Sequence, residues 1–392
     1  MVMSPVRFSG SDVPAASRVH GGPDALGVPR FDFSTNSNAC GPCPEALAAV
    51  RQADASHYPD ASYSALRQQL AAFHGVSPQR LLLAGSASEF IFRITAAVAR
   101  QGARAVSLPA HAYGDYAQAA RAWGLGMVPA MDAAELVWAC EPSSPLGQAH
   151  TRWPQWLLEQ GTHGRGRADS ARLEPVEAAA VVLDRAYEPL RLQGAPSLSD
   201  AQLTQVWQLW TPNKALGLTG VRAAYVVAPR GASDLVAALE SLCPSWPIGA
   251  HGVALLQSWV RPEVQAWLAQ SLLTLRDWKA RQTALLQALG WDCLPSDTPF
   301  FCARPGADCD LTRLRESGIK LRDTASFDLP GLVRVSVQPP LAQDALRLAL
   351  QGRDHLRREA ASGNRKDFEP FLERVPEVPA SAGDEFSTDS DL

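Results

Sequence analysis

Short apolar runs alternate with longer amphipathic stretches between residues 80 and 230. The runs are bounded by Gly, Pro or polar residues, as strands are, and the stretches between them, such as Ser88–Arg100 and Tyr113–Trp123, have helical spacing. We predict strands at Leu81–Leu83, Ala105–Leu108, Leu136–Ala139, Ala179–Leu183, Val206–Leu209 and Ala223–Val227. Strands that alternate with helices indicate an α/β fold with a largely parallel sheet.

A helical region follows from Gly249 to Leu289, and Pro262 is expected to divide it into two helices because proline cannot continue a helix. A second, smaller α/β unit comes after it. Its predicted elements are Phe300–Ala303, a helix near Leu311–Ser317, Ile319–Arg322, Leu332–Val337 and a final helix from Leu341.

These patterns divide the chain into five parts. We expect a flexible N-terminus (1–17), a segment that packs with the small domain (18–70), a large domain (71–250) and connecting helices with a small C-terminal domain (251–351). Residues 352–392 are expected to form a disordered acidic tail. From Asp367 onward the tail has eight acidic residues against Arg374 alone, which suits a disordered extension better than a packed core; partner binding is the alternative. The segment Gly161–Pro175 is expected to be an exposed loop.

Composition excludes several classes of protein. The 392 residues are 46% hydrophobic with a net charge of −4, and they contain neither a long apolar span nor a basic stripe. We therefore expect no membrane association and no nucleic-acid binding. The first residues lack the apolar core of a secretory signal, and the seven cysteines are scattered, which favours reduced thiols in the cytoplasm. No pattern indicates a metal site.

Three segments carry candidate chemistry, and each also has a structural interpretation. LLLAGSASEFIFRI (residues 81–94) predicts a strand, a small-residue turn and a helix whose first amides could bind phosphate; the alternative is an ordinary turn with Ser88 as N-cap. In AAAVVLDRAYEPL (178–190), Asp184 ends an apolar strand, with Tyr187 three residues later; the alternative for Asp184 is a helix cap. In WTPNKALGLTGVRAAY (210–225), Lys214 lies in a Gly-rich turn before Arg222; the alternative is a solvated lysine.

Together the three segments suit pyridoxal phosphate. That cofactor needs a lysine for a Schiff base, a carboxylate for its pyridine nitrogen and a phosphate cup. A fourth motif, Cys40-Gly41-Pro42-Cys43, has the form of a thioredoxin-type redox centre, but no thioredoxin-like βαβ pattern surrounds it. We therefore give the redox function little weight.

Longer segments extend the comparison to a known family. They are VHGG (19–22), DFSTNSNACGP (32–42), HYPDASYSALR (57–67) and LRDTASFDLPGLVRVSVQP (321–339). With the motifs above, they resemble the class I/II aminotransferases of pyridoxal phosphate fold type I over roughly residues 18–350. Within that family the chain is similar to the branch of histidinol-phosphate aminotransferase and the cobalamin-pathway threonine-phosphate decarboxylase.

The resemblance implies a role for each candidate residue. Lys214 would form the Schiff base, Asp184 would pair with the pyridine nitrogen, and Tyr187 would bond the cofactor's phenolic oxygen. Tyr113 would stack on the ring, with His111 as a rival. The cofactor phosphate would be held by Ala87, Ser88, Thr211 and Arg222, and by Tyr58 from a neighbouring subunit, which implies a homodimer. The substrate would be bound by Arg334 at its carboxylate and by His20, Asn36 and Arg322.

Two departures from the family pattern leave the reaction open. Ser144 in EPSSPLG stands where the family commonly has an asparagine that bonds the cofactor's phenolic oxygen, so the resemblance implies Ser144 as a further cofactor-binding residue. Pro23 follows the HGG segment where the decarboxylases carry a polar residue. Transamination and decarboxylation of an amino acid or its phosphate both remain as hypotheses, with a non-catalytic protein on the same scaffold as a third.

Overall fold

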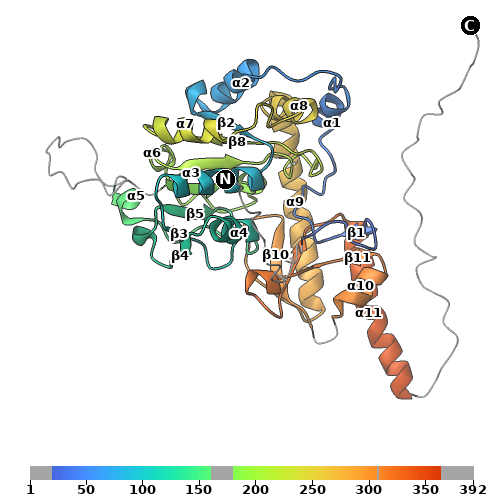
Figure 1. Ribbon diagram of the computed structural model, residues 1–392. Coiled ribbons are helices and arrows are strands. Elements are labelled where there is room, and N and C mark those ends of the chain that lie inside the picture. The colour runs from blue at the N-terminus through green and yellow to red at the C-terminus, as the bar shows by residue number, and fades with distance from the viewer. Residues whose placement is uncertain (1–19, 160–179, 307–308, 363–392) are drawn as a thin grey trace, which may run out of the picture.

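The computed structural model describes residues 20–159, 180–306 and 309–362. Two lobes are visible in Figure 1, a large α/β lobe and a smaller C-terminal lobe. The long helix α9 (Pro262–Ala288) runs from one lobe to the other. It is separated from α8 (Ala250–Trp259) at Pro262, the residue predicted to divide the two helices.

The large lobe is built on a seven-stranded sheet in the order β2, β8, β7, β6, β5, β3, β4. Its strands are β2 (Leu81–Ala84), β3 (Ala105–Ser107), β4 (Gly126–Met127), β5 (Leu136–Cys140), β6 (Ala180–Asp184), β7 (Trp207–Trp210) and β8 (Ala224–Val227). Strand β8 is antiparallel to both neighbours, and the other pairs are parallel. The predicted fold class is confirmed. Strand β4 was missed because its two residues are exposed and show no apolar pattern.

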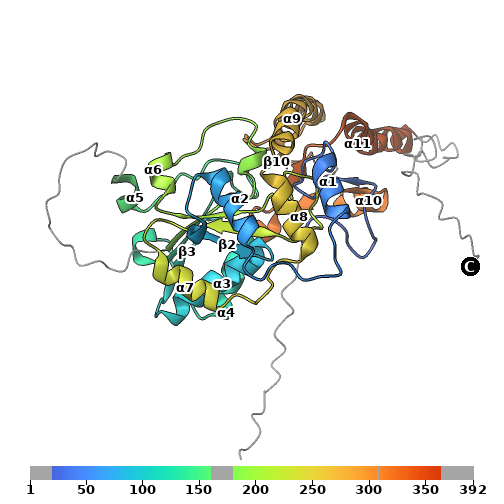
Figure 2. The same ribbon diagram turned by 90° about the horizontal axis from the view of Figure 1, so that it is seen from above.

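Side chains along the central strands alternate between the two faces of the sheet and so contribute to two separate cores. Trp138 and Val182 pack on one face with helices α3 (Ala87–Arg100), α4 (Gly114–Ala122) and α7 (Ser233–Ser241), which lie together in Figure 2. Val137 and Val181 face the other side, where α5 (Gln155–Glu159) and α6 (Asp200–Leu203) lie. The sheet is thus covered on both faces, as a parallel sheet requires.

The small lobe contains an antiparallel sheet in the order β12, β13, β10, β9. The strands are β9 (Asp292–Cys293), β10 (Phe300–Arg304), β12 (Arg322–Asp323) and β13 (Val333–Ser336). The single strand predicted at Ile319–Arg322 is wrong. The chain turns at the buried Leu321, so that β11 (Ile319–Lys320) pairs in parallel with β1 (Phe31–Asp32) while β12 pairs with β13.

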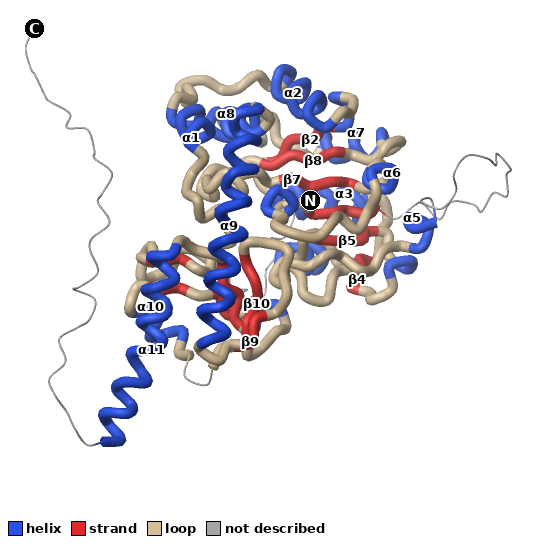
Figure 3. The backbone as a smooth tube through the Cα atoms, turned by 180° about the vertical axis from the view of Figure 1, so that it is seen from behind, coloured by secondary structure: helices blue, strands red, loops and turns tan. Residues whose placement is uncertain are grey.

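The N-terminal segment divides between the lobes. Strand β1 joins the small lobe, as does the preceding Asp24, which pairs with Arg315 and Lys320. Helices α1 (Pro44–Arg51) and α2 (Ser64–His74) instead lie beside α8 at the large lobe, as Figures 1 and 3 show. The small lobe is completed by α10 (Leu311–Glu316) and α11 (Pro340–Ser362). Helix α11 continues past residue 351, where we expected the folded part to end.

Several predicted segments lie outside the described residues: the N-terminus, the loop 161–175 and the acidic tail from residue 363. Among the described residues, no helix has the length and apolarity to cross a membrane.

Backbone hydrogen bonds and close packing hold the N-terminal segment against the loop that carries Lys214. The amide of Asn38 donates to the carbonyl of Lys214 at 2.9 Å, and the amide of Cys43 donates to Leu216 at 2.9 Å. Gly217 has a φ of +68°, and a Cβ there would lie 2.5 Å from the carbonyl oxygen of Gly41. Only glycine fits this position without moving the backbone.

We expect Gly217→Ala to lower the free energy of unfolding by roughly 1–3 kcal/mol, because the new methyl group meets both steric overlap and a strained φ. Denaturant titration measures the change. Gly220→Ala is the matched control: it lies in the same loop, its backbone is not left-handed, and no atom lies within 4 Å of the added carbon. Equal effects of the two substitutions would contradict the packing argument.

Candidate active site

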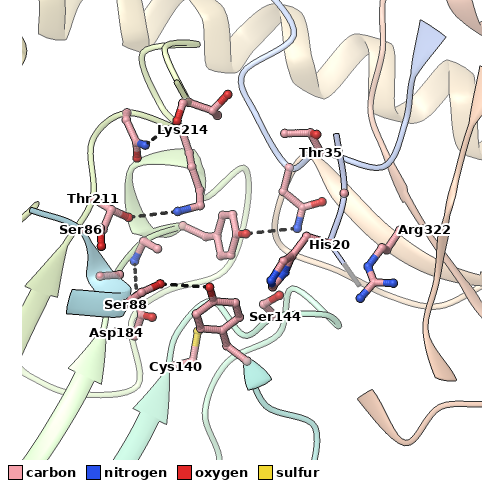
Figure 4. Close-up of a pocket in the computed structure, with 18 of the residues that line it drawn as sticks. His20, Thr35, Ser86, Ser88, Cys140, Ser144, Asp184, Thr211, Lys214 and Arg322 are labelled. Atoms are coloured by element: carbon pink, nitrogen blue, oxygen red, sulfur yellow. Dashed lines mark hydrogen bonds between the residues drawn. The ribbon is translucent and has the colours of Figure 1, made fainter. Parts of the chain in front are cut away.

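A cavity of about 310 Å³ opens between the lobes, at the carboxyl ends of β5, β6 and β7. Ligands of parallel α/β sheets bind at this edge. Every predicted site residue except Tyr58 lines the cavity: His20, Asn36, Ala87, Ser88, Tyr113, Ser144, Asp184, Tyr187, Thr211, Lys214, Arg222, Arg322 and Arg334. The fold therefore brings predicted residues that lie more than 300 positions apart in the sequence into one cavity (Figure 4).

Asp184 ends β6 and is 5% exposed. Its Oδ1 accepts from the amide of Ala186 at 2.9 Å, and its Oδ2 accepts from the hydroxyl of Tyr116 at 2.7 Å. Burial raises the pKa of Asp184, while the Tyr116 hydrogen bond and the charge of Lys214 oppose that rise. The helix-cap alternative is wrong, because the turn that follows is a short 3-10 helix (Glu188–Leu190) whose N-cap is Tyr187.

Lys214 follows β7 and is half-buried at the cavity wall. Its Nζ lies 3.3 Å from Oγ1 of Thr211 and 5.6 Å from the centre of the Tyr187 ring. The preceding residue, Asn213, donates from Nδ2 to the carbonyls of Thr219 and Val221, each at 3.3 Å, which closes the Gly-rich turn. The solvated-lysine alternative is therefore wrong, since the amine is held inside the cavity.

The turn between β2 and α3 presents the start of a 14-residue helix to the cavity. Ser86 is its N-cap, because its hydroxyl accepts from the amide of Glu89 at 3.1 Å; the prediction of Ser88 as N-cap is wrong. The Ser88 hydroxyl lies instead 3.2 Å from that of Tyr113. First-turn amides have no acceptor within their own helix, so this end can bind an anion. Arg222 is exposed at the rim of the same region.

The opposite wall of the cavity comes from the small lobe. Arg334 on β13 is buried and donates from Nη2 to the carbonyl of Ser34 at 2.9 Å and from Nη1 to the hydroxyl of Ser144 at 3.4 Å. Its Nε has no partner among the described residues. Burial lowers the pKa of Arg334. Arg322 on β12 lies directly opposite Arg334 in the strand register and also lines the cavity.

Two further predicted residues lie between these walls. Asn36 donates from Nδ2 to the Tyr187 hydroxyl at 3.4 Å, and its Oδ1 is buried with no partner within the described part of the chain. The ring of His20 lies 6.2 Å from that of Tyr113. An unpartnered buried acceptor in a cavity wall is suited to a ligand's donor group.

The two candidates for ring stacking differ in position. Tyr113 lines the cavity, and burial raises its pKa to about 12. His111 bonds through Nδ1 to the carbonyl of Phe327 in the small lobe at 2.8 Å and is not among the cavity-lining residues. The geometry favours Tyr113 over His111.

The Cys40–Cys43 motif does not form a redox centre in this geometry. The two sulfurs have separate partners: Cys40 contacts the carbonyl of Ser271 at 3.7 Å, and Cys43 contacts the carboxylate of Glu45 at 3.4 Å. Burial raises the pKa of Cys40 to about 11 and also raises that of Cys43. Redox thiols of such motifs instead have lowered pKa values.

Sequence reasoning missed several cavity-lining residues, among them Tyr116, Cys140 and Asn213. Tyr116 had a usable signal, because it lies three residues after Tyr113 and so falls on the same side of the helix. Cys140 is the last residue of a strand that we predicted one residue too short.

Tyr58 is the exception among the predicted residues. It is 77% exposed, its ring stacks on Trp246 at 4.4 Å between centroids, and it lies outside the cavity of its own chain.

The geometry can now be set beside known proteins. The sequence profile of the family described as Aminotransferase class I and II matches residues 29–152 and 177–351. The chain belongs to this family. Histidinol-phosphate aminotransferases of Jannaschia sp. and Thiobacillus denitrificans are similar to it, with 26% identity over 349 residues (83% of this chain, 90% of that protein) and 28% over 342 residues (80% and 83%).

Solved structures show the same fold. Histidinol-phosphate aminotransferase from Sinorhizobium meliloti, solved in complex with pyridoxal-5'-phosphate, has a TM-score of 0.69 at 23% identity, covering 88% of this chain and 98% of that one. L-threonine-O-3-phosphate decarboxylase from Porphyromonas gingivalis has a TM-score of 0.65 at 21% identity, covering 82% and 99%. This class I/II aminotransferase is thus a pyridoxal phosphate-dependent enzyme of fold type I.

The donor set of this aminotransferase fits pyridoxal phosphate. An amine, a buried carboxylate and an open helix N-terminus line one cavity, and Asn36, whose buried Oδ1 has no partner among the described residues, lines it too. When bound, the cofactor supplies an electron sink for bonds at the substrate's α-carbon. The residues that would hold it are Asp184, Tyr187, Tyr113 and Lys214 at the ring, and Ala87, Ser88, Thr211 and Arg222 at the phosphate.

With the cofactor bound, each of these side chains would have a separate role. Asp184 would keep a cationic ring nitrogen protonated, because a buried carboxylate strongly favours a neighbouring positive charge. The Nζ of Lys214 would accept and return a proton, and the hydroxyl of Thr211, 3.3 Å away, would help to orient it. Arg334 would orient an anionic group of the substrate through its planar guanidinium.

We expect wild-type protein mixed with pyridoxal phosphate to gain the mass of the cofactor at Lys214 after borohydride reduction. Lys214→Ala should not gain it, and its activity should fall by at least roughly a hundredfold because the proton-transferring amine is lost. Intact-mass spectrometry and peptide mapping make the measurement.

Lys279→Met serves as the control for this test. Burial lowers the pKa of Lys279 to about 8, yet its amine donates to the carbonyl of Ser296 outside the cavity. The Lys279 variant should be labelled like wild type. Labelling of Lys214→Ala at another lysine, with activity retained, would contradict the assignment.

Proposed function

We propose that this enzyme transfers the amino group of a substrate that carries a phosphate, as a histidinol-phosphate-type aminotransferase. The observation that supports this proposal is the pair Arg322 and Arg334, which face each other on adjacent strands and are 5% and 6% exposed. Burial lowers the pKa of both guanidinium groups, and the nearby charge of Arg334 further lowers that of Arg322. An anionic substrate group between them offsets both burial and mutual repulsion.

The proposed roles follow from where each side chain lies. Arg322 with His20 binds the phosphate of the amino donor, and Arg334 binds the α-carboxylate of the acceptor, 2-oxoglutarate. Asn36 lines the pocket between the substrate and Tyr187. The curated relatives named above support transamination as the reaction, since both are histidinol-phosphate aminotransferases.

A second candidate is decarboxylation of threonine phosphate. The segments at residues 32–42, 57–67 and 321–339 favour it, because they resemble that branch of the family. Threonine phosphate carries both a carboxylate and a phosphate, so each arginine could bind one of them. The two reactions differ in whether the bond to hydrogen or the bond to the carboxylate is broken at the α-carbon.

We expect holoenzyme given histidinol phosphate and 2-oxoglutarate to form glutamate, and holoenzyme given threonine phosphate to release no carbon dioxide. Coupled assays of the two products make the measurement. Carbon dioxide release without glutamate would replace the first candidate with the second, and failure of both phosphate substrates would reject the proposal.

Arg322→Gln tests the role of the second guanidinium within the same assay. We expect KM for the phosphate substrate to rise roughly tenfold or more, the cost of losing one charge-assisted hydrogen bond. The KM for 2-oxoglutarate, whose α-carboxylate we assign to Arg334, should change much less.

We further propose that the enzyme is a cytoplasmic homodimer. No disulfide occurs among the described cysteines, which suits a reducing compartment. Tyr58, exposed on its own chain and implied by the family resemblance to reach a neighbouring cofactor phosphate, supports a second copy packed against this surface.

Mixing two inactive variants tests the shared site. Tyr58→Ala and Lys214→Ala should each have low activity at limiting cofactor. Subunit exchange between the two variants should restore about a quarter of the wild-type activity, because every hybrid of a two-fold dimer then has one intact site. Activity assays after exchange, with sedimentation velocity as the control for assembly, make the measurement. A monomeric holoenzyme would contradict the proposal.

A further inference from the structure

Tyr116 lies on the buried side of α4 and also lines the cavity. Its side chain is fully buried, and its hydroxyl lies 2.7 Å from Oδ2 of Asp184. The second oxygen of Asp184 already accepts from the amide of Ala186 at 2.9 Å. The carboxylate is therefore held by one donor on each oxygen, and each oxygen retains a lone pair for a further donor.

Aromatic packing holds the Tyr116 ring in place. The ring stacks on Trp138 of β5 at 4.4 Å between centroids with 14° between the planes. The Tyr113 ring contacts it edge to face at 5.9 Å and 88°. Because both neighbours are themselves in the packed core or the cavity wall, the phenol has little freedom to turn away from Asp184.

The charges around Asp184 give this hydrogen bond its effect. Lys214, in the loop after β7, is the cation that lowers the pKa of Asp184. The Cys140 thiol of β5 lies nearby, and burial raises its pKa well above the usual range. Burial also keeps the pKa of Tyr116 well above its usual value, so the phenol remains a donor. Tyr116 is the side-chain donor on Asp184 in the described structure, and it opposes the burial that would protonate the carboxylate.

We propose that Tyr116 is a positioning residue that keeps Asp184 ionised and aimed into the cavity, where the carboxylate meets the cationic nitrogen of the bound cofactor. Tyr116 acts through Asp184 and does not itself touch the substrate. The role concerns cofactor binding alone, so it does not depend on which amino acid or phosphate the enzyme uses.

The test measures the affinity of apoenzyme for pyridoxal phosphate as a function of pH, by fluorescence titration. We expect Tyr116→Phe, which keeps the ring and its stacking, to bind roughly tenfold more weakly, the effect of losing one hydrogen bond to a charged group. Without the phenol the pKa of Asp184 rises. Affinity that requires the ionised carboxylate is lost as pH falls through that pKa, so the loss in the variant begins at a higher pH than in wild type.

A double-mutant cycle separates this role from a general structural one. In an Asp184→Asn background there is no carboxylate to stabilise, so adding Tyr116→Phe should change the affinity little. Tyr225→Phe is the matched control: that tyrosine is also fully buried, and its hydroxyl bonds Trp259 at 3.1 Å and His74 at 2.8 Å, away from the cavity. It should lower thermal stability without moving the pH profile.

A second variant preserves the fold. Replacing Tyr116 by 3-fluorotyrosine keeps the shape and makes the phenol a stronger donor, so the loss of affinity should begin at a lower pH than in wild type. A Tyr116→Phe effect that is equal in the Asp184→Asn background, or a pH profile that moves with neither variant, would overturn the proposal.

Discussion

Asp184 is a carboxylate at the end of β6, inside a seven-stranded sheet covered on both faces. Burial leaves it little contact with water, and an unpaired charge in such a place is strongly unfavourable. The structure offsets that burial with the amide of Ala186, the phenol of Tyr116 and the amine of Lys214. Because each of these groups comes from a different part of the chain, the stabilisation of Asp184 depends on the strand order, on the position of α4 and on the turn after β7.

The small lobe buries positive charges, whereas the large lobe buries the negative charge of Asp184. Arg334 and Arg322 line the same cavity from β13 and β12; Arg334 donates to oxygens of Ser34 and Ser144, and Arg322 donates to the hydroxyl of Ser326. A ligand with a cationic ring nitrogen and anionic groups complements both walls at once. In the proposed function, cofactor and substrate would together balance the charges that the two lobes bring to this cavity.

Local patterns in the sequence predicted most of the fold because they depend on short-range chemistry. The strands of the large sheet are apolar runs, and Pro262 separates α8 from α9 through its own ring. The misses have two causes. Strand β4 is short and exposed, and the predicted strand at Ile319–Arg322 divides because its first residues pair with β1. Pairing between distant segments leaves no local signal.

The sequence by itself determined the chemical set of the site: a lysine in a Gly-rich turn, an aspartate at a strand end, a small-residue turn before a helix and arginines in a long matching segment. These are residue types at fixed spacings, and their chemistry does not need coordinates to be recognised. Only the tertiary structure decided that Tyr116 donates to Asp184, that Ser86 rather than Ser88 caps α3, and that Tyr113 rather than His111 reaches the cavity. Those outcomes depend on distances between elements, which packing sets and one-dimensional spacing does not contain.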